Sequence, residues 1–399
     1  MTSGFNFESQ PRLKGLFSGE VDTCTILNGL SALHGQKIMP GSSLIIFDEI
    51  QESPEALNGL KYFCEQTPDD HVATGGSLLG ITLSSQKSFP VGKVNFLDLH
   101  PLSFSEFLSA QDVEMNEYIG RVSSISRLPE VIAERLERHF RDYLIIGGMP
   151  EVVASWVSTK DYQESEAVQK EILQSYELDF AKHAPKADVP KLFLLWKSIP
   201  GQLARENGKF VYGEVKSGAR ARDLEDALRW LNEAGLVYRV NRIERPGIPP
   251  SAYMNSKFFK LYLADTGLLR QMAQVPAATI LLEPDIFGEF KGRLAENFVL
   301  QELRTIQDLD LFYWTSGNTA ELDFVLPYQD DLYPVEVKSG INVKSKSLKL
   351  YREKYHPALA LRFSMLNLQC DDGLLNIPLY LISQLPLLSR LARGSNSKS

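Results

Sequence analysis

The sequence predicts an α/β protein built from several domains. Its 399 residues suit two or three domains at ~100–200 residues each. Through residues 1–110, apolar runs of strand length alternate with apolar positions at helical spacing, which is the pattern of an α/β layer. A hydrophobic content of 44% and a charged content of 23% are those of an ordinary folded chain and exclude global disorder.

The apolar pattern of residues 1–110 predicts an incomplete parallel sheet with helices. Leu44-Ile45-Ile46-Phe47 is a continuous apolar run, typical of parallel strands that are buried on both faces. Residues 21–34 carry apolar side chains at helical spacing, and Pro40-Gly41 separates the two elements. The other elements expected here are a strand at 5–7, a helix at 56–63, a strand at 71–73 and a strand at 94–99.

The rest of the chain predicts four further segments. Residues 111–187 lack strand patterns and predict a helical lid. Residues 188–265 give helix, short segment, helix and strand, the order of a winged helix-turn-helix, with 244–251 as the wing loop. Residues 266–291 predict a linker with loose helix. Residues 292–399 give a helix, three strands joined by turns, and a second helix from Ser345.

Charge and cysteine usage narrow the class of protein. The net charge is −8, so nucleic-acid binding would need a local basic patch. Cys24, Cys64 and Cys370 are odd in number and widely spaced, which fits a reducing compartment and predicts neither a disulfide framework nor a CxxC metal site. No secretory signal and no run of ~18 apolar residues is visible. We expect a cytoplasmic protein without a membrane segment, and the sequence leaves oligomerisation open.

Two acids follow the apolar run of the first domain. Asp48 and Glu49 come directly after Phe47, and ligands of open α/β sheets bind beyond the carboxyl ends of the strands. There, Asp48 can hold a Mg²⁺ ion that bridges nucleotide phosphates, while Glu49 orients an attacking water in the manner of a Walker B motif. The alternative interpretation is a strand that ends in two solvated acids.

The motifs of the first half resemble those of bacterial and archaeal AAA-type ATPases that carry a C-terminal domain of unknown function with a nuclease-like fold. The resemblance runs through most of the chain and rests on four stretches: Phe47-Asp48-Glu49-Ile50-Gln51, Thr74-Gly75, Leu99-His100-Pro101-Leu102-Ser103-Phe104-Ser105-Glu106-Phe107 and Gly147-Gly148-Met149-Pro150-Glu151. It implies a P-loop-type sheet, and it implies that Thr74 is the polar group that senses the γ-phosphate of ATP.

One motif of these ATPases is absent from residues 1–399. The GxxxxGK[ST] loop, whose backbone N–H groups and Lys hold the phosphates, does not occur: Gly92-Lys93 precedes Val94, and Gly208-Lys209 precedes Phe210. We therefore expect ATP binding to be weak and hydrolysis doubtful in this chain. Three interpretations stay open: a shortened chain, a remnant ATPase half, or a working ATPase whose loop lies upstream of Met1.

The C-terminal segment predicts a charged hairpin. Asp323 lies in one expected strand, and Glu336 and Lys338 lie in the next, where two-residue periodicity puts them on one face. The turn at 328–331 would bring Asp323 beside them. Asp323 and Glu336 could then bind Mg²⁺ or Mn²⁺ while Lys338 stabilises charge at a phosphodiester. Upstream, Glu296 lies on a helix beside apolar residues and is positioned to reach the same site.

Glu296, Asp323, Glu336 and Lys338 together resemble the PD-(D/E)xK nuclease signature in order and in strand–turn–strand context. The resemblance implies a metal-dependent nuclease-like domain. A surface hairpin with ordinary charges and a nuclease fold that no longer cuts remain the alternatives. The tripeptide Glu214-Val215-Lys216 repeats the Glu-x-Lys pattern, but no acidic strand precedes it, and we interpret it as chance.

Two basic regions are candidates for nucleic-acid contact. The first follows the hairpin, with Tyr351 and Tyr355 interleaved for base stacking and Glu353 as its opposing acid; its cations are Lys344, Lys346, Lys349, Arg352 and Lys354. The second is the expected winged helix, whose cations are Arg220, Arg222, Arg229, Arg239, Arg242 and Arg245. Acids on the same helix weaken the second candidate, which is equally a connector between domains.

The leading prediction is therefore metal-dependent nucleic-acid binding or cleavage by the C-terminal segment, behind an AAA-type half. The first alternative is a nucleic-acid-binding or regulatory protein without cleavage, using the winged helix and the basic stretch. The second is a working ATPase.

Overall fold

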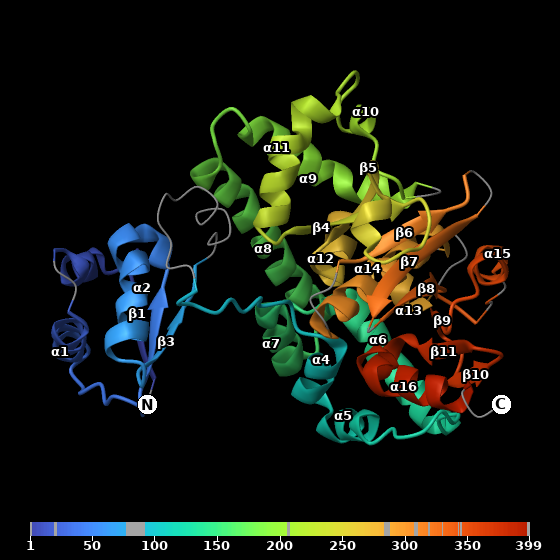
Figure 1. The fold of residues 1–399 in the computed structure, drawn as a ribbon, viewed down its shortest axis with the longest axis horizontal. Coiled ribbons are helices and arrows are strands. Elements are labelled where there is room, and N and C mark those ends of the chain that lie inside the picture. Colours follow the sequence, from blue (N-terminus) through green and yellow to red (C-terminus); the bar gives the residue numbers. More distant parts are fainter. Residues whose placement is uncertain are drawn as a thin grey trace. The chain divides into compact units, whose positions relative to one another are not determined.

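The structure is a computed structural model that describes residues 2–19, 22–76, 92–205, 208–282, 288–306, 310–317, 320–328, 330–341, 343 and 345–396. The chain folds into two compact units, unit 1 (Met1–Leu99) and unit 2 (His100–Ser399), as Figure 1 shows. The sequence places the end of the first domain at residue 110, whereas the structure assigns the helix that begins at Phe104 to unit 2.

Unit 1 is a parallel three-stranded sheet with helices. Its strands lie in the order β1 (Thr2–Asn6), β2 (Leu44–Asp48) and β3 (His71–Thr74). The helices are α1 (Thr23–His34) and α2 (Pro54–Gln66), with 3₁₀ turns η1 (Pro11–Phe17) and η2 (Ile50–Glu52). Ser53 caps α2 by accepting a hydrogen bond from the Ala56 N–H, and Pro54 occupies the first turn. The parallel sheet predicted from the sequence is confirmed.

Two expectations for unit 1 are wrong. The apolar run at 44–47 was expected to be buried on both faces, but Leu44 is 37% exposed and Ile46 is half-buried, so the described residues cover one face of β2. The strand expected at 94–99 does not form, and Leu97 and Leu99 are 90% and 93% exposed. Apolar runs alone do not establish what covers them, because burial depends on elements that are distant in the chain.

Unit 2 contains a mixed eight-stranded sheet in the order β10-β11-β9-β8-β7-β6-β4-β5. The strands are β4 (Val237–Ile243), β5 (Met254–Leu263), β6 (Phe312–Thr315), β7 (Glu321–Tyr328), β8 (Asp331–Val337), β9 (Ala360–Ser364), β10 (Gln369–Asp371) and β11 (Leu374–Pro378). β4 pairs antiparallel with β5 and parallel with β6. Residues 188–265 and 292–399, expected to be separate domains, therefore share one sheet.

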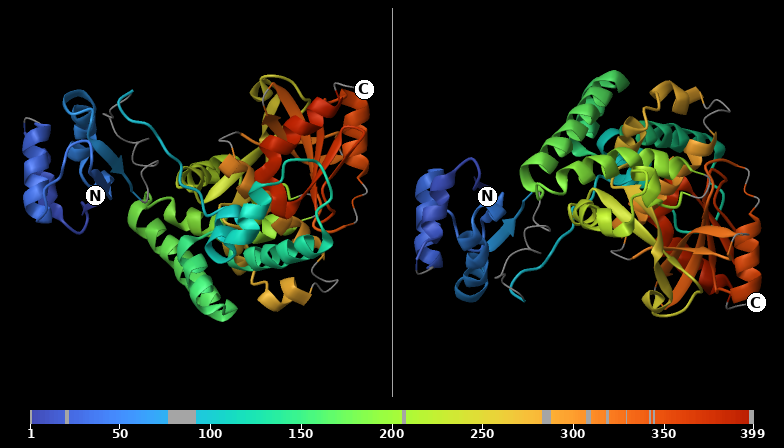
Figure 2. Two further views of the ribbon diagram at one scale, coloured as in Figure 1. Left: turned by 90° about the horizontal axis from the view of Figure 1, so that it is seen from below. Right: turned by 90° about the horizontal axis from the view of Figure 1, so that it is seen from above.

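Helices flank this sheet, as the two views of Figure 2 show. α14 contacts β8 and β5, and α15 contacts β7 and β8. The helices of unit 2 are α4 (Phe104–Gln111), α5 (Val113–Gly120), α6 (Glu130–Ile146), α7 (Pro150–Thr159), α8 (Tyr162–His183), α9 (Val189–Ala204), α10 (Tyr212–Val215), α11 (Ala221–Glu233), α12 (Thr266–Met272), α13 (Ala277–Leu282), α14 (Gly288–Ile306), α15 (Lys346–Tyr355) and α16 (Leu385–Asn396), with 3₁₀ turns η3 (Pro250–Tyr253) and η5 (Leu379–Gln384). Among the described residues, no helix combines the length and apolarity needed to cross a bilayer.

Residues 266–272, the first part of the segment expected to be a loose linker (266–291), are part of the core. Asn297 of α14 accepts a hydrogen bond from the Leu263 N–H at 2.9 Å and donates to the Leu263 carbonyl at 3.1 Å. Gln301, one turn later, accepts from the Thr266 N–H at 3.0 Å. Because both amides are fully buried, α14 is fixed to the end of β5 and the start of α12, and residues 266–272 are rigidly placed.

Candidate functional site

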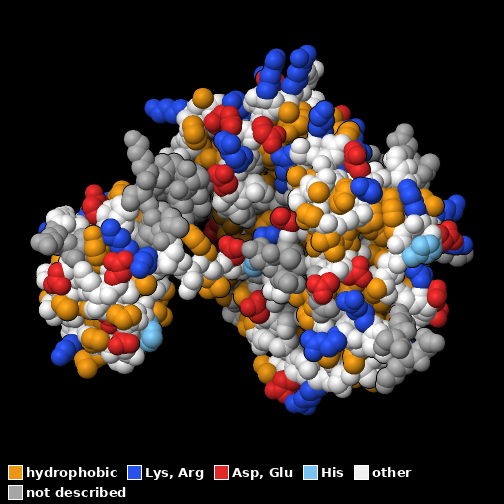
Figure 3. Space-filling view, viewed as in Figure 1, with side chains coloured by type: hydrophobic (Ala, Val, Ile, Leu, Met, Phe, Trp, Pro, Cys, Tyr) orange, Lys and Arg blue, Asp and Glu red, His pale blue; other side chains and the backbone are white. Residues whose placement is uncertain are grey.

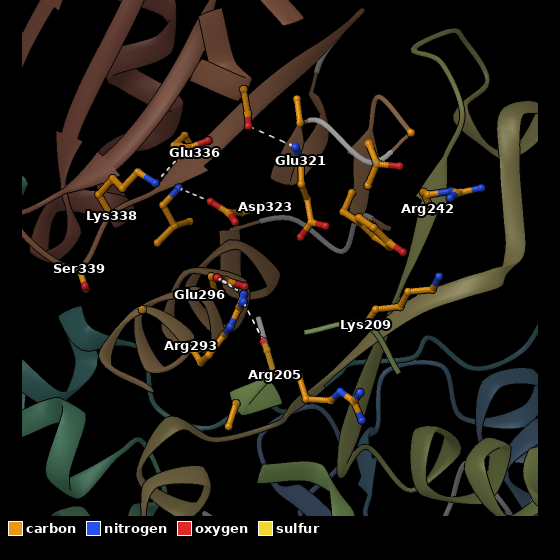
Figure 4. Close-up of a pocket in the computed structure, with 18 residues that line it drawn as sticks. Arg205, Lys209, Arg242, Arg293, Glu296, Glu321, Asp323, Glu336, Lys338 and Ser339 are labelled. Carbon is orange, nitrogen blue, oxygen red and sulfur yellow. Dashed lines mark hydrogen bonds and ion pairs between the residues drawn. The ribbon is translucent and has the colours of Figure 1, made fainter. Parts of the chain in front are cut away.

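The four residues predicted for the nuclease-like site line one cavity of about 840 Å³ in unit 2, shown in Figure 4. Glu296 comes from α14, Asp323 from β7, Glu336 from β8, and Lys338 directly follows β8. The elements that carry them are packed together by the core of the sheet and by α14. The structure therefore brings together residues that are up to 42 positions apart in the sequence.

The hairpin places the two strand acids side by side. β7 and β8 pair antiparallel with Phe324 opposite Val335, which puts Asp323 beside Glu336. Glu336 Oε1 lies 2.6 Å from Lys338 Nζ, so the two side chains share a face as two-residue periodicity predicts. Asp323 Oδ2 accepts a 2.8 Å hydrogen bond from the Val337 N–H, which fixes the carboxyl group across the hairpin.

Buried carboxyl groups crowd around Asp323. Burial raises the pKa of Asp323 well above its ordinary value, and the negative charges of Glu296 and Glu336 raise it further. Burial by itself would lower the pKa of Lys338, but the carboxylates of Glu336, Asp323 and Glu296 together outweigh it and the pKa is raised. The raised pKa of Asp323 favours its protonated form until further positive charge arrives, and the raised pKa of Lys338 favours its ammonium form.

Glu296 is held by three side chains from two elements, β5 and α14. Tyr262 Oη of β5 donates a 2.9 Å hydrogen bond to Glu296 Oε2. Arg293, one turn earlier on α14, donates to Oε1 at 2.6 Å. Lys260 Nζ of β5 lies 3.8 Å from Oε2. The carboxylate is buried, and these partners fix its orientation.

Lys260 is the residue that the sequence-based prediction missed. Its side chain is fully buried, and its Nζ lies 2.5 Å from Glu321 Oε1 and 3.8 Å from Glu296 Oε2. Burial opposes its charge, yet Glu296, Glu321 and Asp323 together raise its pKa. A signal was present: in Lys260-Leu261-Tyr262 the alternation puts Lys260 and Tyr262 on one strand face. It pointed to no site because β5 is far from the hairpin in sequence.

The side chains at the hairpin fit a divalent cation with few protein ligands. Glu336 Oε2 is buried and accepts no hydrogen bond within the described part of the chain, although Oε1 is paired with Lys338. Among the described residues, no group of three or more His, Cys, Asp or Glu forms a complete metal cage. Mg²⁺ commonly binds through one or two carboxylates and keeps several waters. Asp323 and Glu336 would supply those carboxylates.

In unit 1, the predicted nucleotide residues lie at one edge of the sheet. Phe47 of β2 is opposite Thr74 of β3, so Asp48 and Thr74 are at the carboxyl ends of adjacent parallel strands. Asp48 Oδ2 accepts a 2.8 Å hydrogen bond from Asn6 Nδ2. Glu49 has a φ of 50°, a left-handed conformation that costs a non-glycine residue about 1 kcal/mol, and its carboxylate accepts a hydrogen bond from Gln51. The expected edge arrangement is present.

The basic stretch after the hairpin forms α15, where Lys346 and Lys349 are exposed and Arg352 is paired with Asp372 at 3.0 Å. Lys344 lies outside the described residues. The interleaved tyrosines were expected to stack on bases, but Tyr351 is 1% exposed and packs on Trp314 with ring centroids 5.1 Å apart. Tyr351 therefore belongs to the core, and that part of the expectation is wrong.

The arginines of residues 188–265 are mostly paired with acids of the same segment. Arg239 binds Glu225, with 2.5 Å between Nη1 and Oε1, and Arg229 lies 2.9 Å from Asp226. On the face that Figure 3 shows, basic and acidic side chains are interspersed over unit 2. Arg205 and Arg242 also line the cavity. The decoy Glu214 lies on α10 and is paired with Arg205 at 2.6 Å.

Comparisons with known proteins match three segments of the chain. Residues 6–108 match a family model described as an AAA domain. Residues 137–279 and 291–382 match two domains of unknown function, DUF8612 and DUF4143. The first match supports an AAA-type, ATPase-like N-terminal segment, as the sequence motifs predicted, and the last supports the expected C-terminal domain of unknown function.

Among solved structures, the Walker-type ATPase of Pyrococcus abyssi is similar at 14% identity with a TM-score of 0.36, covering 66% of this chain and 74% of that chain. The comparison with curated proteins finds no match.

Proposed function

We propose that unit 2 is a divalent-metal-dependent phosphodiesterase of the PD-(D/E)xK type that acts on nucleic acid, joined to an AAA-type domain. The observation that carries the proposal is the convergence of Asp323, Glu336 and Lys338 in one cavity around a buried carboxylate oxygen, Glu336 Oε2, that accepts no hydrogen bond from the described residues. Glu296 completes the set.

Each residue of the set has a distinct role in this proposal. Asp323 and Glu336 would hold Mg²⁺ or Mn²⁺, and the ion would supply a Lewis acid for the phosphodiester. Lys338, an ammonium 2.6 Å from Glu336, would orient the attacking water and stabilise charge on the phosphoryl oxygens. Glu296 is fixed by Tyr262 and Arg293, so it would position the solvent shell of the site.

Cleavage of labelled DNA and RNA in Mg²⁺ or Mn²⁺ tests this proposal. We expect cleavage by the wild-type chain, and we expect Asp323→Ala or Lys338→Ala to reduce the rate at least ~100-fold, the scale on which a single electrostatic or acid–base group acts. Glu214→Ala, in the decoy tripeptide on α10, should leave the rate unchanged. Cleavage that persists in both site variants would reject the assignment.

A second candidate function, nucleic-acid binding without cleavage, is favoured by the Lys338–Glu336 ion pair. At 2.6 Å, this contact engages a proposed metal ligand and the proposed catalytic ammonium with each other. In this candidate, residues 188–265 act as a winged helix and α15 contributes Lys346 and Lys349. Nucleic-acid binding with no cleavage in any metal would favour it.

We also propose that residues 1–399 turn over ATP negligibly. Asp48 and Thr74 end adjacent parallel strands, but residues 1–399 contain no GxxxxGK[ST] loop to hold the phosphates. Phosphate release should therefore equal that of the Glu49→Gln variant. A wild-type kcat near ~1 s⁻¹, the low end for ordinary enzymes, that Glu49→Gln abolishes would contradict this expectation.

A further inference from the structure

The wall of the cavity away from the hairpin carries two cations on one aromatic ring. Lys209 and Arg242 both line the cavity, and Figure 4 shows them on the side away from Glu336 and Lys338. Lys209 Nζ lies 3.8 Å from the centroid of the Phe258 ring, and the Arg242 guanidinium carbon lies 4.0 Å from the same centroid. The shared ring fixes two positive charges close to each other.

The Arg242 charge is only weakly compensated by acids. Its ion-pair partner Glu244 lies 3.7 Å away and is 62% exposed, so solvent screens the pair. Arg242 Nε is buried and has no hydrogen-bond partner among the described residues. Burial lowers the pKa of Lys209 most, the Arg242 charge lowers it further, and the Glu321 carboxylate opposes both. An anion that contacts both side chains would relieve the repulsion and satisfy the buried Nε–H.

We propose that Lys209 and Arg242 form a phosphate-binding subsite that holds the nucleic-acid backbone next to the phosphodiester positioned at Asp323 and Glu336. The proposal rests on the proposed function and names a contact surface for it. A polynucleotide offers further phosphates in line with the reacting one, and a cavity of about 840 Å³ exceeds the need of a single phosphate. This subsite, formed by Lys209 and Arg242, is a different surface from α15 and from the exposed arginines of α11.

The salt dependence of nucleic-acid binding tests the subsite. Binding of a short DNA duplex is measured in EDTA, so that no cleavage occurs, over a series of KCl concentrations. Each phosphate contact adds about 0.9 to the magnitude of the slope of log Kobs against log[salt]. We expect Lys209→Met and Arg242→Gln each to reduce this magnitude by about 1 and to weaken binding, while keeping the aliphatic packing on Phe258. Thermal melting checks that the variants fold. If Arg242→Gln does not fold, Lys209→Met alone tests the subsite.

Matched controls separate this subsite from the other basic surfaces. Arg222→Gln on α11 and Lys349→Gln on α15, each 77% exposed, should leave the slope unchanged. Wild-type slopes in both cavity variants would overturn the subsite, and a loss in either control would move the interface to that helix while leaving cleavage at Asp323 untouched.

Inorganic phosphate at constant ionic strength is the second probe. It should raise the melting temperature of the wild type but not of Lys209→Met or Arg242→Gln, and it should compete with the duplex. Phosphate stabilisation without any duplex binding would assign the subsite to free phosphate and overturn the proposal. Absence of both effects would also overturn it, whereas absence of metal-dependent cleavage alone would reject only the proposed function.

Discussion

Mg²⁺ or Mn²⁺ is expected to raise the melting temperature of the chain, and Asp323→Ala is expected to remove most of that rise. The ion would bind the folded site only, because Asp323 and Glu336 adjoin through the pairing of β7 and β8. Such linkage stabilises the fold by about 2.7 kcal/mol when the free ion is at about 100 times its Kd. Calorimetry or thermal melting in EDTA and in excess metal measures the difference.

The decoy tripeptide supplies the control for this experiment. Glu214→Ala removes a carboxylate from α10, where Glu214 is paired with Arg205, and the metal-induced rise should stay intact. A rise that survives Asp323→Ala would place the metal elsewhere and remove the basis for a nuclease-type site. Equal melting temperatures with and without metal in the wild type would have the same consequence.

Lys260→Met is expected to destabilise the protein by about 3–5 kcal/mol, the cost of removing one partner from a buried ion pair. Lys260 is fully buried, 2.5 Å from Glu321 and 3.8 Å from Glu296, and methionine fills a similar volume without the charge. The variant would leave a buried carboxylate cluster without its cation. Urea unfolding measures the loss of free energy.

The double variant Lys260→Met/Glu321→Gln tests the cause. If the loss comes from uncompensated charge, the double variant should be more stable than Lys260→Met alone. Lys349→Met, at an exposed position of α15, should change stability by no more than about 0.5 kcal/mol. A loss of that small size in Lys260→Met would mean that the cluster is not stabilised by this ammonium.

The hairpin could be predicted from the sequence because its information is local. Glu336 and Lys338 are two positions apart, and a short turn separates them from Asp323, so strand periodicity alone places the three together. Lys260 and Arg242 could not be placed in this way. Arg242 reaches the cavity, and Lys260 of β5 reaches two acids that line it, because β4 pairs with both β5 and β6. No local pattern encodes the pairing of β4 with β6, strands about 70 positions apart.

The sequence-based predictions were wrong for aromatic and apolar residues whose role depends on burial. Tyr351 was expected on a binding face, but the helical spacing that exposes Lys349 turns Tyr351 onto Trp314. Leu97 and Leu99 suggested a strand, yet the structure leaves them exposed. In both cases composition was read correctly, and the missing information was which neighbour, if any, covers the side chain.

The parallel pairing of β4 with β6 joins the two segments that match domains of unknown function into one folding unit. The two segments are therefore expected to evolve together. The segment matching DUF4143 begins at residue 291, but Lys260 and Tyr262, which hold Glu296, lie in the segment matching DUF8612. A fragment of residues 292–399 would leave the β6 edge unpaired, an invitation to aggregation, and would strip Glu296 of two partners. A substitution of Lys260, in the first segment, should be tolerated only with a compensating substitution of Glu321, in the second. Recombination between residues 279 and 291 would separate these two ion-pair partners.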